Sequence, residues 1–222
     1  MALILNIDTA TETASISLSK EGSSLALLQN KDQKEHASWL HPAIEKMMQE
    51  TGFGMKDLRA VAVTAGPGSY TGLRVGMAAA KGFCYALNIP FIAIGTLDIM
   101  AFAAKDEEAD FICPMIDARR MEVFTAVYDK NLKKIIEPQA MLLDENSFAE
   151  LLSSGKIIFL GNGSNKLRSI ISNNKAFFSL VRADASHLAQ LSNKNFVKKE
   201  FADLAYIQPL YLKEFYSPAR KE

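Results

Sequence analysis

The chain has 222 residues, of which 49% are hydrophobic, and its 25 basic and 25 acidic residues give a formal net charge of zero at pH 7. This length allows one large domain or two small ones with real apolar cores. A neutral chain lacks the broad basic surface of a protein that binds nucleic acid alone, so any RNA contact is expected to be local or shared with a partner.

Cysteine usage and hydropathy indicate the compartment. Cys84 and Cys113 lie in apolar runs without a CxxC spacing, so buried free thiols in a reducing compartment are expected. The opening residues MALILNID lack the basic region of a signal peptide. The most apolar later stretch, 84–104, is interrupted by Pro90 and Asp98. The sequence therefore predicts a soluble, cytoplasmic protein with no membrane contact.

The first elements in the chain are predicted to be a hairpin meander and a helix. Residues 2–7, 13–19 and 24–29 have the apolar runs or alternation of three antiparallel strands. A helix follows, whose apolar face would be formed by Ala37, Leu40, Ile44, Met47 and Met48. Pro42 implies that this helix either starts late or is kinked near its first turn.

Residues 60–88, AVAVTAGPGSYTGLRVGMAAAKGFCYALN, are the most informative stretch. Their pattern predicts a strand, a glycine turn and a long helix that starts near Ser69. From Arg74 onward, the polar side chains of this helix fall in one stripe roughly 60° wide, which leaves about 200° of apolar surface. Such a helix should be covered on two sides.

The two apolar sides of this helix differ in bulk. The bulky side consists of Leu73, Met77, Cys84 and Leu87. The small side consists of Gly72, Gly76, Ala79 and Ala86, with Phe83 among them. Small residues allow a second helix to approach closely. That helix could belong to this chain or to a partner protein, in which case the predicted interface is Trp39, Leu40, Gly72, Gly76, Ala79 and Phe83.

A charged break divides the chain. Residues 91–94 predict a short strand, and Thr96 is the expected N-cap of a helix that ends near residue 104. The run KDEEAD at 105–110 predicts a boundary between an N-terminal lobe, 1–105, and a C-terminal lobe, 106–222, whose tail could pack back on the first lobe.

The second half repeats the order of the first. Strands are predicted at 111–117, 121–128 and 135–143, followed by a helix capped by Asp144 and a strand that enters a Gly-x-Gly turn at 157–164. A tail adds a helix with His187, Leu188 and Leu191 and an apolar run interrupted by Pro209. The economical interpretation is a duplicated α/β unit with mixed sheets flanked by helices.

The glycine turns and two aspartates are the candidate ligand sites. Weak candidates for a nucleotide or phosphate site are Asp8, Thr11, Gly66, Gly68, Ser69, Asp117, Gly161 and Gly163. Free N–H groups at a helix start bind anions, but neither turn has the lysine of a Walker A loop or the spacing of a dinucleotide fingerprint. Tight turns are the alternative for the glycines. The two aspartates could hold magnesium, or cap their own turns.

Metal and nucleophile chemistry is not indicated. His36 and His41 lie about 140° apart on a helix and cannot share an ion, and His187 stands alone. No GxSxG or other base-bearing nucleophile motif occurs. Arg119 and Arg120 are interpreted as a solvated turn, with an anion or RNA contact as the alternative. No cofactor, metal or catalytic residue is therefore assigned.

With these residues in view, the chain resembles the TsaB family, also called YeaZ, which belongs to the actin-like ATPase superfamily and is related to TsaD. The resemblance rests on NIDTATETASISL at 6–18, EHASWLHPAIEKMM at 35–48, VTAGPGSYTGLRVGMAAAKGF at 63–83 and PMIDARRMEVFTAVYD at 114–129. It is strong to about residue 129, and the C-terminal third matches only through LGNGS.

The resemblance implies an actin-like, two-lobed fold and a role in making threonylcarbamoyladenosine next to the anticodon of tRNA. In that pathway TsaD carries the metal and transfers the threonylcarbamoyl group, TsaE is an ATPase, and the TsaB family supplies a non-catalytic partner that dimerises with TsaD. If the small side of the helix that starts near Ser69 faces TsaD, the free chain exposes a large apolar patch and is expected to form a homodimer when TsaD is missing. Because the chain is neutral, contact with tRNA is expected only through the complex.

The sequence also allows two alternative functions. A small actin-like ATPase or kinase would use Asp8, Asp117 and the glycine turns, although no phosphate-binding lysine or base is identifiable. A peptidase is suggested only by an older name of the family, and no catalytic constellation supports it.

Overall fold

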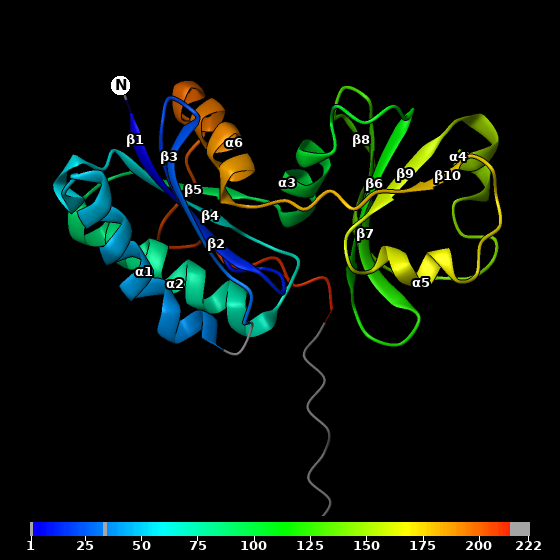
Figure 1. Ribbon diagram of the computed structural model, residues 1–222, viewed down its shortest axis with the longest axis horizontal. Helices are drawn as coiled ribbons and strands as arrows, with labels where there is room; N and C mark the ends of the chain where they lie inside the picture. Colours follow the sequence, from blue (N-terminus) through cyan, green and yellow to red (C-terminus); the bar gives the residue numbers. More distant parts are fainter. Residues whose placement is uncertain (1, 33–34, 214–222) are drawn as a thin grey trace, which may run out of the picture.

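The structure of the chain, a computed structural model, describes residues 2–32 and 35–213 and consists of two lobes, each built on one five-stranded sheet (Figure 1). The strand order is β3-β2-β1-β4-β5 in the first sheet and β10-β9-β6-β7-β8 in the second. No helix in the described ranges is long and apolar enough to cross a membrane.

The first lobe begins with three strands and is followed by alternating helices and strands. Its elements are β1 (Leu3–Asp8), β2 (Ala14–Lys20), β3 (Ser23–Asn30), α1 (His36–Thr51), η2 (Met55–Asp57), β4 (Ala60–Thr64), α2 (Tyr70–Leu87), β5 (Phe91–Ile94) and α3 (Thr96–Ala103). The predicted meander and the strand, turn and helix of residues 60–88 are confirmed.

The second lobe repeats this order with shorter helices. Its elements are β6 (Phe111–Asp117), β7 (Glu122–Asp129), β8 (Lys134–Leu142), α4 (Ala149–Ser154), β9 (Ile157–Leu160), α5 (Ser164–Arg168) and β10 (Ala176–Phe178), and α6 (Ala185–Lys198) follows. In both sheets the first strand pairs antiparallel with its hairpin partner and parallel with a later strand, β4 or β9. This shared pairing supports the duplication predicted from sequence.

Two helices pack across the predicted lobe boundary. In α3, Leu97 and Met100 pack in the core of the second sheet with Ile112 and Leu160. Conversely, α6 lies against the first sheet (Figure 1), where Leu188 is buried with Ile4 and Ile92. Each lobe thus buries a helix from the other half of the sequence, which ties the two lobes together.

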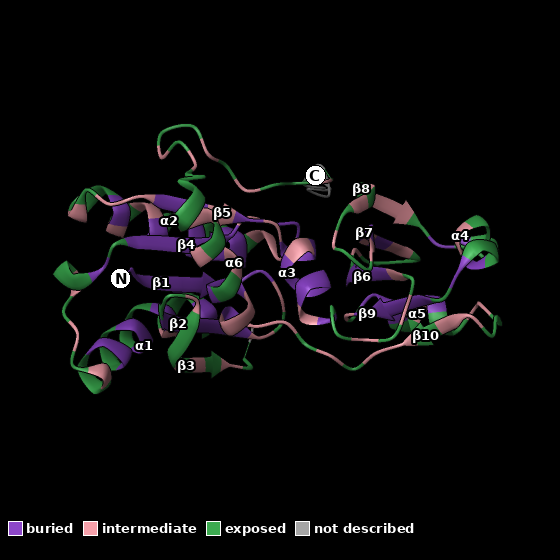
Figure 2. Cartoon of the chain, turned by 90° about the horizontal axis from the view of Figure 1, so that it is seen from above, coloured by how far each residue is buried: buried purple, intermediate pink, exposed green. Residues whose placement is uncertain are grey.

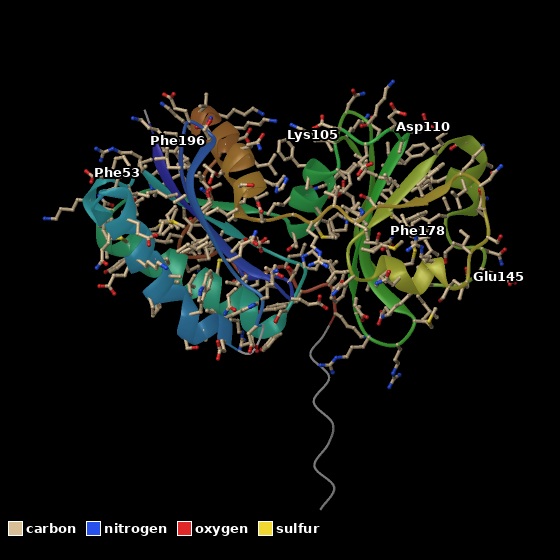
Figure 3. All side chains as sticks on the ribbon, viewed as in Figure 1. Phe53, Lys105, Asp110, Glu145, Phe178 and Phe196 are labelled. Carbon is tan, nitrogen blue, oxygen red and sulfur yellow. The ribbon has the colours of Figure 1, made fainter. Side chains whose placement is uncertain are left out.

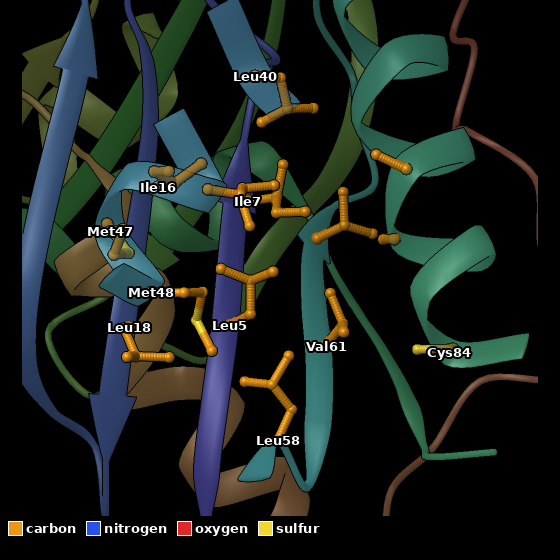
Figure 4. Close-up of a cluster of buried hydrophobic side chains, with 14 of the residues drawn as sticks. Leu5, Ile7, Ile16, Leu18, Leu40, Met47, Met48, Leu58, Val61 and Cys84 are labelled. Atoms are coloured by element: carbon orange, nitrogen blue, oxygen red, sulfur yellow. The ribbon is translucent and has the colours of Figure 1, made fainter. Parts of the chain in front are cut away.

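The larger core of the first lobe lies between its sheet and the helices α1 and α2 (Figure 4). In α1, Leu40, Ile44 and Met47 are buried at the three- and four-residue spacing of a helix that covers a sheet. The prediction that Ala37 lies on this face is wrong, because Ala37 is exposed and His36 is buried. The helix begins at His36 and continues through Pro42, so it does not start late.

On the opposite face of the first sheet, under α6, a buried cluster of polar side chains lies beside the apolar core. Asn6 Nδ2 donates to Ser19 Oγ at 2.9 Å, and Ser192 Oγ of α6 donates to Asn6 Oδ1 at 2.6 Å. All three residues are fully buried. Figure 2 shows the central strands β1 and β4 of this sheet coloured as buried along their length. These two hydrogen bonds pair buried polar groups of β1, β2 and α6 with one another. They fix the position of α6 on the sheet more specifically than apolar contacts alone would.

Two predicted helix caps are corrected by the structure. Gly95, not Thr96, is the N-cap of α3, and Thr96 is the buried first residue of that helix. Phe148 is the N-cap of α4, whereas Asp144 closes a separate turn in which Asp144 Oδ1 accepts from Ser147 Oγ at 3.0 Å. A polar residue before an apolar run is a capping signal, but Asp144 Oδ1 bonds to the Asn146 amide and Ser147 Oγ within its own turn instead of capping a helix.

Candidate functional site

The N-terminus of α2 is built into the first lobe. Ser69 caps the helix by accepting a hydrogen bond from the Gly72 amide at 3.3 Å, as predicted for the helix start. The Ser69 amide itself donates to Ala10 O at 2.7 Å. This N–H group is therefore engaged within the chain rather than left for an anion.

The small side of α2 faces its own sheet. A Cβ added at Gly76 would clash with Thr9 Oγ1, and one added at Gly72 would clash with Thr9 O. Thr9 Oγ1 also donates to Gly72 O at 2.7 Å. These glycines let α2 approach the end of β1, so their assignment to a partner interface is wrong. Leu40 and Ala79 of the same predicted interface are likewise buried within the chain.

A different row of α2 is open to solvent. Thr71, Arg74, Ala78, Gly82 and Tyr85 are exposed. Nothing lies within 4 Å of a Cβ built at Gly82, in contrast to Gly76. The helix therefore has small residues on two sides, one against its own sheet and one facing outward.

Helix α1 borders this open row. The half-buried Trp39 and Phe83 of the predicted interface lie on α1 and α2, and the His41 ring packs edge-on against Phe83 with 5.7 Å between centroids. A groove of about 390 Å³ lies beside α1. It is lined by residues of α1, by the turn after α1 and by Phe83 of α2, and it includes Met48 and Phe53, the latter labelled in Figure 3. We call Trp39, His41, Ala78, Gly82 and Phe83 together the α1/α2 face.

The two candidate aspartates have unlike environments. Asp8 is buried and accepts from the Ala10 amide at 3.1 Å, and burial raises its pKa to about 6. Asp117 is exposed; partial burial acts to raise its pKa, but hydrogen bonds from Lys166 Nζ and the Arg119 amide hold the pKa below its usual value. Each carboxylate thus has partners in its own lobe.

The glycines of both turns pack against the chain itself. Gly66 has φ of +109°, and a Cβ there would lie 2.6 Å from Leu210 O in the segment after α6. The same test places Gly68 against Ala10, Gly161 against Met115 and Gly163 against Ile116. Close packing alone therefore accounts for glycine at these positions.

A contact between the lobes passes through residues that sequence reasoning did not single out. Asn162 Nδ2 donates to Glu12 Oε1 of the first lobe at 3.1 Å, and Asn162 Oδ1 accepts from the Asp117 amide at 2.9 Å. Thr11, at the same β1–β2 loop, donates from Oγ1 to Thr13 O at 3.4 Å. The Gly-x-Gly turn thus uses its central asparagine to hold the lobes together.

The histidines are separated, as predicted. His36 is buried, which lowers its pKa, whereas the exposed His41 packs on Phe83. His187 Nδ1 lies 3.1 Å from Asp184 Oδ1 at the start of α6. Among the described residues, no group of three or more His, Cys, Asp and Glu side chains could hold a metal ion.

The chain is similar in sequence to a described protein family and to proteins of known name. The family model described as "TsaD: tRNA N6-adenosine threonylcarbamoyltransferase" matches residues 29–214. The tRNA threonylcarbamoyladenosine biosynthesis protein TsaB of Bacillus subtilis is 30% identical over 217 residues, covering 95% of this chain and 93% of that protein.

This chain belongs to the TsaB family. The TsaB protein of Haemophilus influenzae is 26% identical over 95% of this chain and 93% of its own length. The solved structure of YeaZ from Pseudomonas aeruginosa superimposes with a TM-score of 0.80 at 26% identity, covering 96% of this chain and all 100% of that one. The predicted TsaB resemblance and duplicated actin-like fold are confirmed.

Proposed function

We propose that this chain is the non-catalytic subunit of the assembly that adds the threonylcarbamoyl group to adenosine next to the anticodon of tRNA. It would act in the cytoplasm by binding a TsaD-type transferase, with TsaE as a further component. The family names support the pathway, since curated TsaB relatives are called biosynthesis proteins for this modified nucleoside. The docking role is our inference from the surface.

The α1/α2 face carries the proposal. Exposed Ala78 and Gly82 leave the α2 backbone accessible to a partner helix, and α1 and α2 also carry the half-buried aromatic side chains of Trp39 and Phe83. Aromatic side chains beside a groove are the usual anchors of a protein interface. Without TsaD, the same face would pair with a second copy of the chain.

The side chains that could act as nucleophiles support a non-catalytic role. Burial raises the pKa of Cys84 to about 11 and that of Cys113 to about 12, so both thiols stay protonated at neutral pH. Asp117 is paired with Lys166 at 2.8 Å. The chemistry is therefore assigned to TsaD.

The same packing weighs against the ATPase or kinase alternative. Gly66, Gly68, Gly161 and Gly163 each face atoms of the chain, so a nucleotide site would require this packing to open. We therefore propose no cofactor, and expect weak nucleotide and tRNA binding by the chain alone.

A reconstituted reaction tests the proposal. Purified TsaD and TsaE of the same organism are supplied with ATP, threonylcarbamoyl adenylate and tRNA, with and without this chain, and the modified nucleoside is measured by mass spectrometry. We expect no product from this chain alone and a large increase when it is added to TsaD. Product from this chain alone, or TsaD activity that does not respond to it, would contradict the proposal.

A further inference from the structure

Arg74 occupies a fixed position on the exposed row of α2. Its Cζ lies 4.3 Å from the centroid of the Tyr70 ring, one turn earlier in the helix. Its Nε donates to the hydroxyl of Tyr211 at 3.3 Å, and the Tyr211 ring lies 5.2 Å from that of Tyr70. Tyr211 belongs to the segment after α6, so two distant parts of the chain hold one guanidinium.

Within the part of the chain that the structure describes, this guanidinium has no acidic partner. No ion pair within residues 2–32 and 35–213 includes Arg74, and its only hydrogen bond there uses Nε. The 18 residues of α2 contain Arg74 and Lys81 but no Asp or Glu. The Arg74 side chain is exposed, and no hydrogen bond or ion pair to another described residue uses its two terminal nitrogens.

Such a group is prepared for a carboxylate. An arginine with free terminal nitrogens offers a planar fork that matches a carboxylate through two parallel hydrogen bonds. Its side chain is already restrained by the two tyrosines, so less freedom is lost when the ligand binds. Arginine and tyrosine are also the residues most often found to dominate protein interfaces.

We propose that Arg74 anchors a carboxylate side chain of the TsaD-type partner, whose helix would lie along Ala78 and Gly82 of α2. The inference rests on the proposed function and assigns to it a specific charged contact. Arg74 lies four residues from Ala78 and eight from Gly82, so all three share one helix face. Tyr70 and Tyr211 are positioning residues for the anchor.

The surroundings of Arg74 favour a protein ligand over RNA. Phosphate backbones are bound by several cations acting together, whereas α2 offers only Lys81 besides Arg74 and the chain as a whole is neutral. The adjoining surface is small and apolar, which suits a helix. Because Tyr211 holds Arg74 in place, the segment after α6 would influence the affinity for the partner, although this segment lies outside the α1/α2 face.

The test is calorimetric titration of the full chain with TsaD at low and high salt. We expect Arg74→Ala to weaken binding at least about tenfold, and Arg74→Lys nearly as much, because lysine cannot form the planar fork. Tyr211→Phe should weaken binding about two- to fivefold. Lys198→Ala removes an exposed charge from α6, on the other side of the sheet, and should change affinity less than twofold.

The outcomes separate this inference from the proposed function. If the parent chain fails to bind TsaD, the proposed function fails. If the parent binds and Gly82→Phe does not, but Arg74→Ala binds like the parent, only the anchor is overturned. The anchor is also overturned if Arg74→Ala weakens tRNA binding but binds TsaD like the parent. A third contradicting result is a fall in melting temperature in both Arg74→Ala and Arg74→Lys that accounts for their weaker TsaD binding.

Discussion

Gly76 lies so close to Thr9 that no side chain fits between α2 and the end of β1. A Cβ at position 76 would clash with Thr9 Oγ1 and would meet Val63 Cγ2 at 3.4 Å. Thr9 is buried and bonded to α2 through Gly72 O, so it cannot turn aside without losing that bond. Gly76 is therefore needed for packing within the chain and not for contact with a partner protein.

Gly76→Ala should therefore destabilise the chain. Overpacking of this kind costs about 1 to 3 kcal/mol, to be measured as a change in the free energy of unfolding in urea. Gly82→Ala is the matched control, because it lies on the same helix with open space around it. It should leave stability unchanged or raise it by up to about 1 kcal/mol. Equal stability of the two variants would show that the small sides of α2 are assigned wrongly.

Asp8→Asn should stabilise the chain above pH 6. The folded-state pKa of Asp8 is raised from 3.8 to about 6, so the stabilising neutral carboxyl is fully present below pH 3.8 and lost as pH rises through 6. Asparagine stays neutral at all these pH values and keeps an oxygen for the Ala10 amide. At pH 8 the free energy of unfolding should be higher for Asp8→Asn than for the parent by up to about 3 kcal/mol, with little difference near pH 4.

Asp117→Asn is the control with the opposite sign. The pKa of Asp117 is lowered in the folded chain, so its contribution is present at neutral pH and lost as pH falls. Its replacement should reduce stability slightly at pH 8 and have less effect in acid. If Asp8→Asn instead lost stability at pH 8, the Asp8 charge would have a partner that its burial does not reveal.

Ser192→Ala should loosen α6 from the first sheet. The change removes the hydroxyl that donates to Asn6 Oδ1 and leaves this buried oxygen without that donor. The expected loss is about 1 to 3 kcal/mol in the free energy of unfolding. Ser153→Ala removes an exposed hydroxyl and should cost less than about 0.5 kcal/mol. Similar losses for both serines would argue against the polar anchoring of α6.

The sequence predicted most elements because their signals are local. Apolar runs and glycine turns located β1, β4 and α2, and the start of α2 near Ser69 followed from the same pattern. The orientation of α2 was not local. Its wheel shows small residues on two sides, and only the position of Thr9, far away in sequence, decides that Gly72 and Gly76 face inward. Gly82 beside the polar stripe was an available but unused signal.

Long-range packing also explains what was missed around the site. Nothing in residues 199–213 predicts that Leu210 N donates to Ala65 O at 2.7 Å, or that Tyr211 reaches Arg74. The exchange of α3 and α6 between the lobes is equally non-local, since each helix has an apolar face that would fit either sheet. Periodicity identifies a buried face but does not identify what covers it.

The most direct test of the docking proposal is calorimetric titration of TsaD into the Gly82→Phe variant, with the parent and Gly76→Ala measured in parallel. A phenylalanine at position 82 has room in the free chain, where nothing lies within 4 Å of the Cβ, but would hold a partner helix away from α2. We expect no measurable binding and a melting temperature within a few degrees of the parent. TsaD binding by Gly82→Phe with parental affinity would contradict the docking role of the α1/α2 face.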